Sequence, residues 1–414
     1  MASSSTFSII LGILQATICL ISIARTVTIA HPSPLASEAI AMVESGWWSN
    51  YSNNASERCQ WPGISCNTAG SIAKINISDV PNIEVGDRFG KLNFTSFPNL
   101  VILDLSDRPL GGKIPHQIGD LFALKYLDLS YCGLSGELPS SLGNLTQVEY
   151  IDISYNDNIN GSIPPQLGNL VNLVSLNLSA NSLTGKIPLE LGFLSNLVYL
   201  DLHSNKVFGP IPFTLYHMTD LEYLYIDDNY LEGSISKNIE NFKKISFLSI
   251  TNNRFTGHIP LALCRLPTLE KIYLDQNQIS GSVPPCIGNL SNLEILELDS
   301  NLLNGSIPSC LGKLSKLHTL RLDSNLLEGS IPEDICDLAN LTSISLYQNK
   351  LNGSIPSCLG KLSKLDTLSL GSNLLKSHIP QEICDLAVGS LHLSDNRAEA
   401  LRCKPRGLER KQEQ

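Results

Sequence analysis

Tyrosine and aspartate side chains recur close together through the middle of this sequence, many of them 24 residues apart. A tyrosine ring gives a rigid contact area with a hydroxyl group, which suits recognition of a ligand. A carboxylate beside it favours a ligand that carries lysine, arginine or a free amine. The alternative is that many of these acids are simply solvated. The candidate ligand-binding residues are Tyr126, Asp128, Tyr150, Asp152, Tyr199, Asp201, Tyr223, Tyr225, Asp227, Phe247, Tyr273 and Asp275.

Asp201, His203 and Ser204 are the nearest approach to a catalytic set in the sequence. Catalysis by such residues also needs an oxyanion hole and a pocket, and no motif around them supplies either. The sequence has no phosphate-binding glycine loop, no GxGxxG, no HExxH and no GxSxG motif. It has no CxxC spacing, and its eight histidines are scattered, so no metal site is expected. We therefore expect no catalytic residue, no cofactor and no enzyme.

A repeat of about 24 residues positions the tyrosines and acids. In the copy LEILELDSNLLNGSIPSCLGKLSK, Leu296 and Leu298 alternate with Glu297, as in a short strand with one apolar face. Asn301 is placed to bond backbone groups of its own and neighbouring coils, and Gly305 permits a bend. Twelve regular copies begin at Leu100, Leu124, Val148, Leu173, Leu197, Leu221, Ile245, Leu269, Leu293, Leu317, Leu341 and Leu365.

One coil of this kind cannot cover its own leucines, so neighbouring coils must stack on it. The predicted fold is an α/β repeat: a curved solenoid with a parallel sheet on its inner face and short helical or 3-10 turns outside. The candidate residues occupy strand positions between the leucines, which places them on the inner face. We expect a signal peptide over residues 1–30, an N-terminal cap over 31–71, repeats over 72–396 and a disordered charged tail over 397–414.

The leader carries no charged side chain over residues 1–24. One small-x-small cleavage candidate lies at the end of its apolar run and a second lies shortly after it. This pattern predicts a secretory signal peptide, although the basic n-region is absent. The alternative is an uncleaved signal anchor. We expect a protein that is secreted to the extracellular space (the apoplast), or held at the cell surface if the leader is an anchor. The net charge of −10 argues against a general nucleic-acid binder.

The eleven cysteines fit an oxidising compartment, given the leader. Cys59 and Cys66, in the string CQWPGISC, are expected to form a disulfide in a cap that also holds Trp47, Trp48 and Trp61. The alternative is a redox pair.

Six more cysteines lie on the outer side of the later coils. Positions 22 residues apart fall on successive coils, which stack about one strand spacing apart and so within disulfide reach. This spacing predicts the bridges Cys264–Cys286 and Cys336–Cys358. The pairings Cys310–Cys336 and Cys358–Cys384 compete with them, and on our pairing Cys384 has no partner. A further alternative is that all six are small buried hydrophobes.

Acceptor sequences for N-linked glycans, N-x-S/T, are numerous. Asn177 is expected on the inner face, where a glycan would block the approach of a ligand. The acceptors are Asn50, Asn54, Asn76, Asn93, Asn144, Asn160, Asn177, Asn289, Asn304, Asn340 and Asn352.

The string CQWPGISC ahead of repeats of the form LxxLxLxxNxLxGxIPxxLGxL resembles the extracellular part of plant leucine-rich-repeat receptor-like kinases and receptor-like proteins. Residues 183–188, LTGKIP, are one clear copy of the specific element, and the resemblance covers about Glu38 to Asn396. It implies a curved or superhelical solenoid that binds a protein or peptide partner on its inner face. A membrane receptor kinase is one such partner. No membrane span is expected in the mature chain, and the Arg-x-Arg carboxylate clamp of some peptide-hormone receptors is not evident.

The resemblance implies an extracellular binding module that recognises a peptide, a co-receptor or a microbial molecule in signalling or defence. One alternative is an inhibitor of microbial cell-wall hydrolases, like the polygalacturonase-inhibiting proteins. Another is a truncated receptor product without independent function, whose last coil would leave Leu365, Leu368 and Leu370 poorly covered.

Overall fold

The structure is a computed structural model that describes residues 33–51, 54–81, 83, 85–376, 379–385 and 389–396. The expected signal peptide (residues 1–30) and charged tail (residues 397–414) lie outside these described residues.

The main element is a 15-stranded sheet to which almost every coil contributes one short strand. All neighbouring strands are parallel, except that β1 runs antiparallel to β2. The strands in spatial order are β1 (Ile64–Cys66), β2 (Ile72–Asn76), β3 (Ile102–Asp104), β4 (Tyr126–Asp128), β6 (Tyr150–Asp152), β8 (Ser175–Asn177), β9 (Tyr199–Asp201), β11 (Tyr223–Tyr225), β13 (Phe247–Ser249), β15 (Lys271–Tyr273), β17 (Ile295–Glu297), β19 (Thr319–Arg321), β21 (Ser343–Ser345), β23 (Thr367–Ser369) and β24 (Ser390–His392).

Each strand follows the alternation that the sequence predicts. In β9, Leu200 is completely buried, while Tyr199 and Asp201 on either side of it point to the inner face. The same register continues from coil to coil, so that Leu200 pairs with Leu224 and Leu224 with Leu248. The leucines thus form one continuous core along the solenoid, and no single coil could bury them alone.

Short 3-10 turns form the outer side of the coils. The LG pair in these turns has a steric cause, because a Cβ on Gly192 would collide with the backbone carbonyl of Thr214 in the next coil. The turns are η1 (Ala55–Gln60), η2 (Gly86–Lys91), η3 (Phe94–Ser96), η4 (His116–Asp120), η5 (Ser140–Asn144), η6 (Pro165–Asn169), η7 (Leu189–Phe193), η8 (Phe213–His217), η9 (Lys237–Asn241), η10 (Leu261–Arg265), η11 (Pro285–Asn289), η12 (Ser309–Lys313), η13 (Glu333–Asp337) and η14 (Ser357–Lys361).

Between the inner strand and the outer turn, the NGS and EGS segments form smaller parallel sheets of two to four strands. Gly305 ends one of these strands with φ of 72°, a left-handed conformation that explains the glycine of the LxGxIP element. These strands are β5 (Ser135–Glu137) and β7 (Asn158–Asn160), then β10 (Phe208–Gly209), β12 (Tyr230–Ser234) and β14 (Arg254–Thr256), then β16 (Ser280–Gly281), β18 (Leu302–Gly305), β20 (Leu326–Gly329) and β22 (Lys350–Leu351).

A ladder of buried asparagines joins the coils, as expected for Asn301. Its Nδ2 donates to the carbonyls of Leu274, Leu298 and Asp299, and its Oδ1 accepts from the amide of Ile279. Each asparagine therefore satisfies backbone groups of two coils that would otherwise be buried without partners.

The first two repeats lack the ladder asparagine, and other side chains contact the backbone carbonyls there. Arg108 donates to the carbonyls of Ile77, Ser78 and Val80. The Cys132 thiol contacts the carbonyl of Leu105.

A cap closes the N-terminal end of the core. Helix α2 (Pro34–Ser45) carries Glu38, whose completely buried carboxylate pairs with Arg58 at 3.3 Å and accepts from the amide of Ile72. Trp47 and Trp48 are buried behind this helix, and the disulfide Cys59–Cys66 ties the following loop to β1. The disulfide and the tryptophans thus belong to the cap, as the sequence predicts.

The C-terminal coils are covered by β24 and by helix α3 (Gln381–Cys384). Leu368 and Leu370 are completely buried and Leu365 is 4% exposed, so the expectation of poorly covered leucines at this end was wrong. The disulfides here are Cys264–Cys286 and Cys336–Cys358, the 22-residue pairings. Cys384 is also disulfide-bonded, contrary to the expectation that it has no partner.

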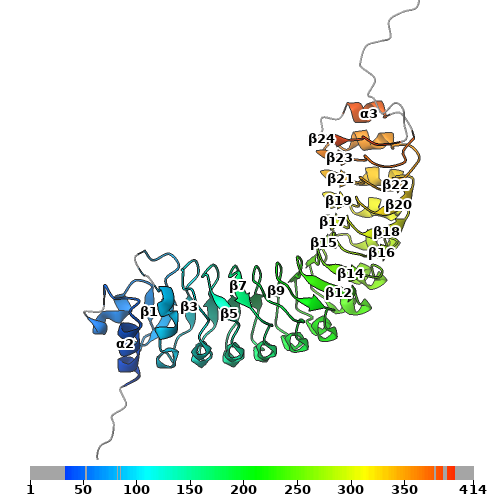
Figure 1. Ribbon diagram of the computed structural model, residues 1–414. Coiled ribbons are helices and arrows are strands. Elements are labelled where there is room, and N and C mark those ends of the chain that lie inside the picture. Colours follow the sequence, from blue (N-terminus) through cyan, green and yellow to red (C-terminus); the bar gives the residue numbers. More distant parts are fainter. Residues whose placement is uncertain are drawn as a thin grey trace, which may run out of the picture.

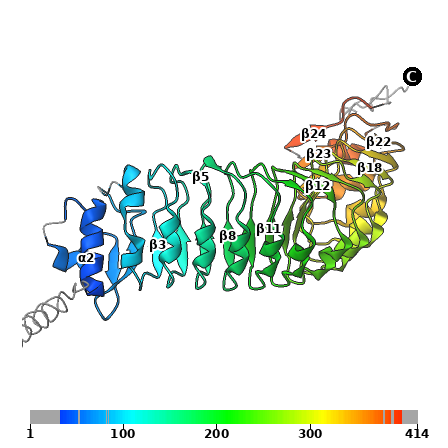
Figure 2. The ribbon, with the colours of Figure 1, turned by 60° about the horizontal axis from the view of Figure 1, so that its bottom comes forward.

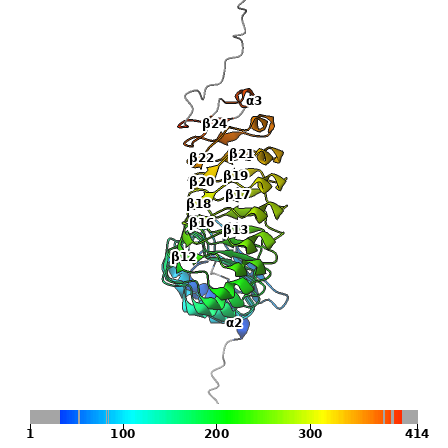
Figure 3. The same cartoon turned by 90° about the vertical axis from the view of Figure 1, so that its right-hand side faces the viewer.

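The coils stack into a bent solenoid whose two arms meet near β12–β15 (Figure 1). The main sheet lines the inside of the bend and the 3-10 turns lie outside it. In Figure 2 the first arm is a row of parallel coils that begins at α2, and in Figure 3 the second arm rises towards α3. Among the described residues, no helix is both long enough and apolar enough to cross a bilayer.

Candidate ligand-binding face

Three rows of side chains cross the inner face, because every coil repeats the same positions in register. The first row holds the first residue of each strand, the second row the third residue, and the third row the residue two places after the strand. All twelve candidate residues lie in these rows. The first row contains Tyr126, Tyr150, Tyr199, Tyr223 and Phe247; the second contains Asp128, Asp152, Asp201, Tyr225 and Tyr273; the third contains Asp227 and Asp275.

The second-row aspartates of the first repeats are hydrogen-bonded within the solenoid. Asp152 Oδ1 accepts from the amide and the hydroxyl of Ser154, at 2.9 and 2.6 Å. Its Oδ2 accepts from the Tyr150 hydroxyl at 3.3 Å and from Asn177 Nδ2 at 2.9 Å. Asp128 makes the equivalent bonds with Ser130 and with the Tyr126 hydroxyl. These carboxylates hold the coil in shape and leave little acceptor capacity for a ligand.

Tyr126 and Tyr150 stack on adjacent strands, with ring centroids 4.4 Å apart and planes only 3° apart. Burial, followed by the charge of Asp128, raises the pKa of Tyr126 to about 12, so its hydroxyl stays neutral at any physiological pH. The next strand, β8, presents Ser175 and Asn177 instead of aromatic rings. The stacked pair is thereby separated from the aromatic residues that follow.

Asp201 and His203 form a close pair, with Nδ1 of His203 2.7 Å from Oδ1 of Asp201. The hydrogen bond to Asp201 raises the pKa of His203, and the charges of Asp201 and Asp227 add to this while burial opposes it. The Tyr199 hydroxyl donates to the other oxygen of Asp201 at 2.9 Å. In the described part of the chain, no hydrogen bond joins Ser204 to this pair. Tyr199, Asp201 and His203 thus form one hydrogen-bonded group on the inner face.

Five aromatic rings form a connected strip across β9, β11, β13 and β15, and we call these residues the aromatic strip: Tyr199, Tyr223, Tyr225, Phe247 and Tyr273. The centroids of Tyr199 and Tyr225 are 5.6 Å apart, those of Tyr225 and Phe247 4.4 Å, and those of Phe247 and Tyr273 5.2 Å. Such spacings give favourable ring contacts that hold the side chains in place. The strip is rigid and partly exposed, as a contact surface requires.

A pocket of about 270 Å³ opens beside the C-terminal end of the strip. Its aromatic walls are Tyr225, Phe247 and Tyr273, and its acidic side consists of Asp227, Asp275 and Glu297. Ser249 and Thr251 complete the lining. We call this cavity the acidic aromatic pocket. Burial raises the pKa of both Asp227 and Glu297, in each case as the largest cause.

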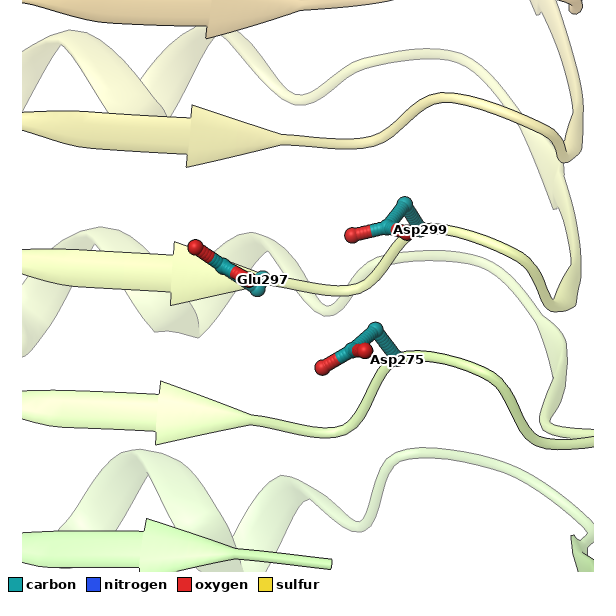
Figure 4. Close-up of side chains that lie close together, drawn as sticks. All are labelled: Asp275, Glu297 and Asp299. Carbon is teal, nitrogen blue, oxygen red and sulfur yellow. The ribbon is translucent and has the colours of Figure 1, made fainter. Parts of the chain in front are cut away.

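Acidic residues continue from this pocket into the next two coils. Asp275, Glu297 and Asp299 each place one carboxylate oxygen within 4.8 Å of the others (Figure 4). Arg321 is the cation among them, 3.7 Å from Glu297, 3.5 Å from Asp299 and 3.7 Å from Asp323. Three carboxylates this close resemble a metal-binding group, but the guanidinium of Arg321 already pairs with two of them, Glu297 and Asp299, and its charge disfavours a bare metal ion there. Burial and then the charge of Asp323 raise the pKa of Asp299 to about 6.

Sequence reasoning did not single out Glu297, Asp299, Arg321 or Asp323. For Asp299 and Asp323 the signal was present in the third row, where a serine stands at positions 106, 130 and 154 but an aspartate stands at positions 299 and 323. An acid in the third row has no serine two residues later to satisfy it, so it differs from an acid in the second row.

The sequence matches family models described as leucine rich repeat over residues 123–145, 172–194, 220–242, 244–266, 267–327 and 340–362. The solved structure PEPR1-AtPEP1 superposes with a TM-score of 0.80 at 32% identity, over 87% of this chain and 52% of that chain. This chain therefore has the fold of a leucine-rich-repeat solenoid. A plant peptide hormone receptor, RGFR1 in complex with RGF2, superposes with a TM-score of 0.67 at 29% identity, over 82% of this chain and 65% of that one.

Among curated proteins, a probable leucine-rich repeat receptor-like protein kinase of Arabidopsis thaliana is 38% identical over 77 residues. The match covers 18% of this chain and 7% of the kinase. The leucine-rich-repeat solenoid therefore spans about half the length of the PEPR1 chain and a small part of the kinase. These comparisons show the fold and the similarity to plant receptor ectodomains.

The glycan acceptors of the solenoid divide by exposure. Asn177 is half-buried on the inner face, where its amide donates to Asp152 and its oxygen accepts from Ser179. Asn76 and Asn340 are also half-buried, and their amides donate to Asp104 and to the carbonyl of Ser315. The exposed acceptors are Asn50, Asn54, Asn93, Asn144, Asn160, Asn289, Asn304 and Asn352.

Proposed function

We propose that this chain is an extracellular binding module that recognises a peptide on the inner face of its solenoid. The observation that carries the proposal is the aromatic strip. Tyr223, Tyr225 and Phe247 lie outside the leucine core, and Tyr223 is 37% exposed. The Tyr225 ring contacts the Phe247 ring of the next coil. Aromatic side chains that are rigid, adjacent and accessible are typical of contact surfaces.

The shape of the face supports a peptide as the ligand. The strip crosses four neighbouring strands and lies where the two arms of the solenoid meet, inside the bend (Figure 1). A linear ligand laid along the inner face could contact successive coils without a deep cavity. The similar solved structures include the plant peptide hormone receptor RGFR1 in complex with RGF2, which favours this class of ligand.

An extracellular location is part of the proposal. Disulfides Cys59–Cys66, Cys264–Cys286 and Cys336–Cys358 persist in oxidising compartments and not in the cytosol. The eight exposed N-x-S/T acceptors suit a secreted glycoprotein, and the leader predicts entry into the secretory pathway. Roles in signalling or defence, and partnership with a membrane receptor kinase, belong to this proposal as expectations from the resemblance.

The test is binding by the full chain produced through a secretory pathway. The immobilised protein is used to select from a random peptide library, and synthetic copies of the selected peptides are titrated. The double variant Tyr225→Ala/Phe247→Ala is compared with Phe213→Ala/Leu261→Ala, which removes side chains that are 65% and 68% exposed on the outer turns. We expect at least about tenfold weaker binding for the first variant and no change for the second.

Two results would overturn the proposal. One is that the wild-type protein, shown to be folded, selects no peptide. The other is that selected peptides bind the inner-face variant as tightly as the wild type. Dose-dependent inhibition of a polygalacturonase by the wild-type protein would instead support the inhibitor alternative.

A further inference from the structure

We propose that the acidic aromatic pocket is a subsite for one cationic group of the peptide, a lysine or arginine side chain or a free amino terminus. This inference rests on the proposed function and adds the chemistry of the ligand. The pocket joins three aromatic rings to three carboxylates in one cavity, and these are the two kinds of group that attract an organic cation.

The size of the cavity suits a side chain. Pockets that enclose a whole drug-sized ligand have roughly 300–1,000 Å³. The pocket is shallow and widely open, and its volume of about 270 Å³ accepts the end of one long side chain while the rest of a peptide stays on the face. The methylene stem of lysine or arginine would lie against the rings of Tyr225, Phe247 and Tyr273, and the charged end would reach the carboxylates.

The carboxylates at the pocket are only partly compensated by the protein itself. Arg321 pairs with Glu297, Asp299 and Asp323, whereas no lysine or arginine of the described residues forms an ion pair with Asp227 or Asp275. Lys271 lies over the Phe247 ring at 5.9 Å, which shows that this ring accepts a cation, but it forms no described ion pair with the pocket acids. One bound cation would therefore meet carboxylates that lack a positive partner.

Unsatisfied oxygens point to the same conclusion. Oδ1 of Asp227, which lines the pocket, is buried and has no hydrogen-bond partner among the described residues. Oδ1 of Asp299, on a residue that is only 4% exposed and lies beside the pocket, also has no hydrogen-bond partner, although Arg321 Nε lies 3.5 Å from it. Asp299 lies within 4.8 Å of the carboxylates of Asp275 and Glu297, and the three side chains converge in Figure 4. A buried carboxylate oxygen without a donor is costly, and a ligand ammonium or guanidinium would supply the donor.

The test uses small probes as well as peptides. Nα-acetyl-lysine methylamide, Nα-acetyl-arginine methylamide and norleucine methylamide with a free amino group represent the three cation sources. Nα-acetyl-norleucine methylamide is the uncharged match. Binding is followed by NMR with the wild-type chain and with Asp275→Asn/Glu297→Gln. Asp104→Asn, an inner-face acid of β3 in the same row as Glu297, is the matched control.

We expect at least one charged probe to bind about tenfold more tightly than the uncharged match, and the double variant to abolish this preference. Asp104→Asn should retain it. Both substitutions in the pocket preserve side-chain size, and thermal unfolding confirms that the variants are folded. Which charged probe is preferred identifies the source of the cation.

Peptides selected from the library separate the two proposals. If selected peptides bind but replacement of each basic group by a neutral one leaves affinity unchanged, the subsite is wrong and the proposed function stands. If no peptide is selected, the proposed function fails, and the small probes alone decide the subsite. Equal binding of charged and uncharged probes would overturn the subsite in either case.

Discussion

In the repeats before Tyr223, each inner-face aspartate is the last residue of its strand, whereas from Asp227 to Asp323 the aspartates stand two residues later. Asp152 represents the first region, and its two oxygens accept four hydrogen bonds from Tyr150, Ser154 and Asn177. Asp227, Asp299 and Asp323 represent the second region, and each has a buried oxygen without a described hydrogen-bond partner. The same residue type on the same face is thus hydrogen-bonded through both oxygens in one region. In the other it keeps a buried oxygen without a hydrogen bond, which for Asp299 and Asp323 faces Arg321 at 3.5 and 3.7 Å.

The difference follows from what lies two residues after the strand. In the first region a serine occupies that position, and its amide and hydroxyl bind the aspartate before it. In the second region the acid itself occupies the position. Ser300 and Ser324 each donate to only one oxygen of Asp299 and Asp323, whereas Asp275 accepts through both oxygens, from Thr251 and Gln276. Under the proposed function, we therefore expect the ligand to be recognised mainly from β11 to β19, beside the aromatic strip, and less by the first repeats.

The largest expected effect is on the stability of the first region. Asp152→Ala removes the acceptor for four donors, two of them on Ser154, and should lower the free energy of unfolding by about 3 kcal/mol. The matched control is Asp227→Ala, which should cost less than about 1 kcal/mol, because one oxygen of Asp227 has no partner to lose. Urea unfolding measures both, and hydrogen exchange at the Ser154 amide locates the change. Equal losses would remove the distinction between the two regions.

In the second region, removal of the charge of Asp299 should stabilise the protein. The pKa of Asp299 is about 6 in the folded chain, compared with 3.8 for an ordinary aspartate, as in the unfolded chain. Between these pH values the folded state therefore binds more protons than the unfolded state. The free energy of unfolding should therefore rise as the pH falls from 7 towards 4. Asp299→Asn should raise it at pH 7 by on the order of 2 kcal/mol and have no such advantage at pH 4. Destabilisation at pH 7 would contradict the desolvation of this carboxylate.

The fold could be predicted from the sequence because its determinants repeat. Leu296, Leu320 and their equivalents are buried wherever the period continues, whatever occupies the inner-face positions. The asparagine ladder and the cap disulfide follow from local spacing in the same way. Cys384 was misjudged because its disulfide bond was considered only through pairings between regular coils.

The candidate face was also predictable, since strand alternation places Tyr199 and Asp201 on one side. The position of an acid on the inner face did not predict whether its carboxylate has hydrogen-bond or ion-pair partners. That depends on Ser154 beside Asp152, and on Arg321 one coil away from Glu297. Asp299 and Asp323 were passed over because no tyrosine stands beside them, although their place after the strand sets them apart.

A smaller effect is expected from Arg321, which forms ion pairs with the acids of the second region. Arg321→Gln leaves Glu297, Asp299 and Asp323 without their positive partner. Because Arg321 is partly exposed and its contacts are 3.5 to 3.7 Å long, the loss at pH 7 should be about 1 kcal/mol. The loss should shrink as the pH falls towards 4 and the carboxylates take up protons. A loss that is the same at both pH values would mean that Arg321 acts through packing.

The smallest expected effect returns to the first region and asks whether its tyrosines act as hydrogen-bond donors or as rings. Tyr150→Phe removes one of the four bonds to Asp152, the longest at 3.3 Å, and keeps the stack with Tyr126 at 4.4 Å. We expect a loss of about 0.5 kcal/mol in the free energy of unfolding, and unchanged affinity for peptides that bind the aromatic strip. Tyr150→Ala, which also removes the stacked ring, should cost more than Tyr150→Phe. If Tyr150→Phe weakened peptide binding as much as Phe247→Ala does, the ligand would extend over both regions, and the first repeats would belong to the binding face as well.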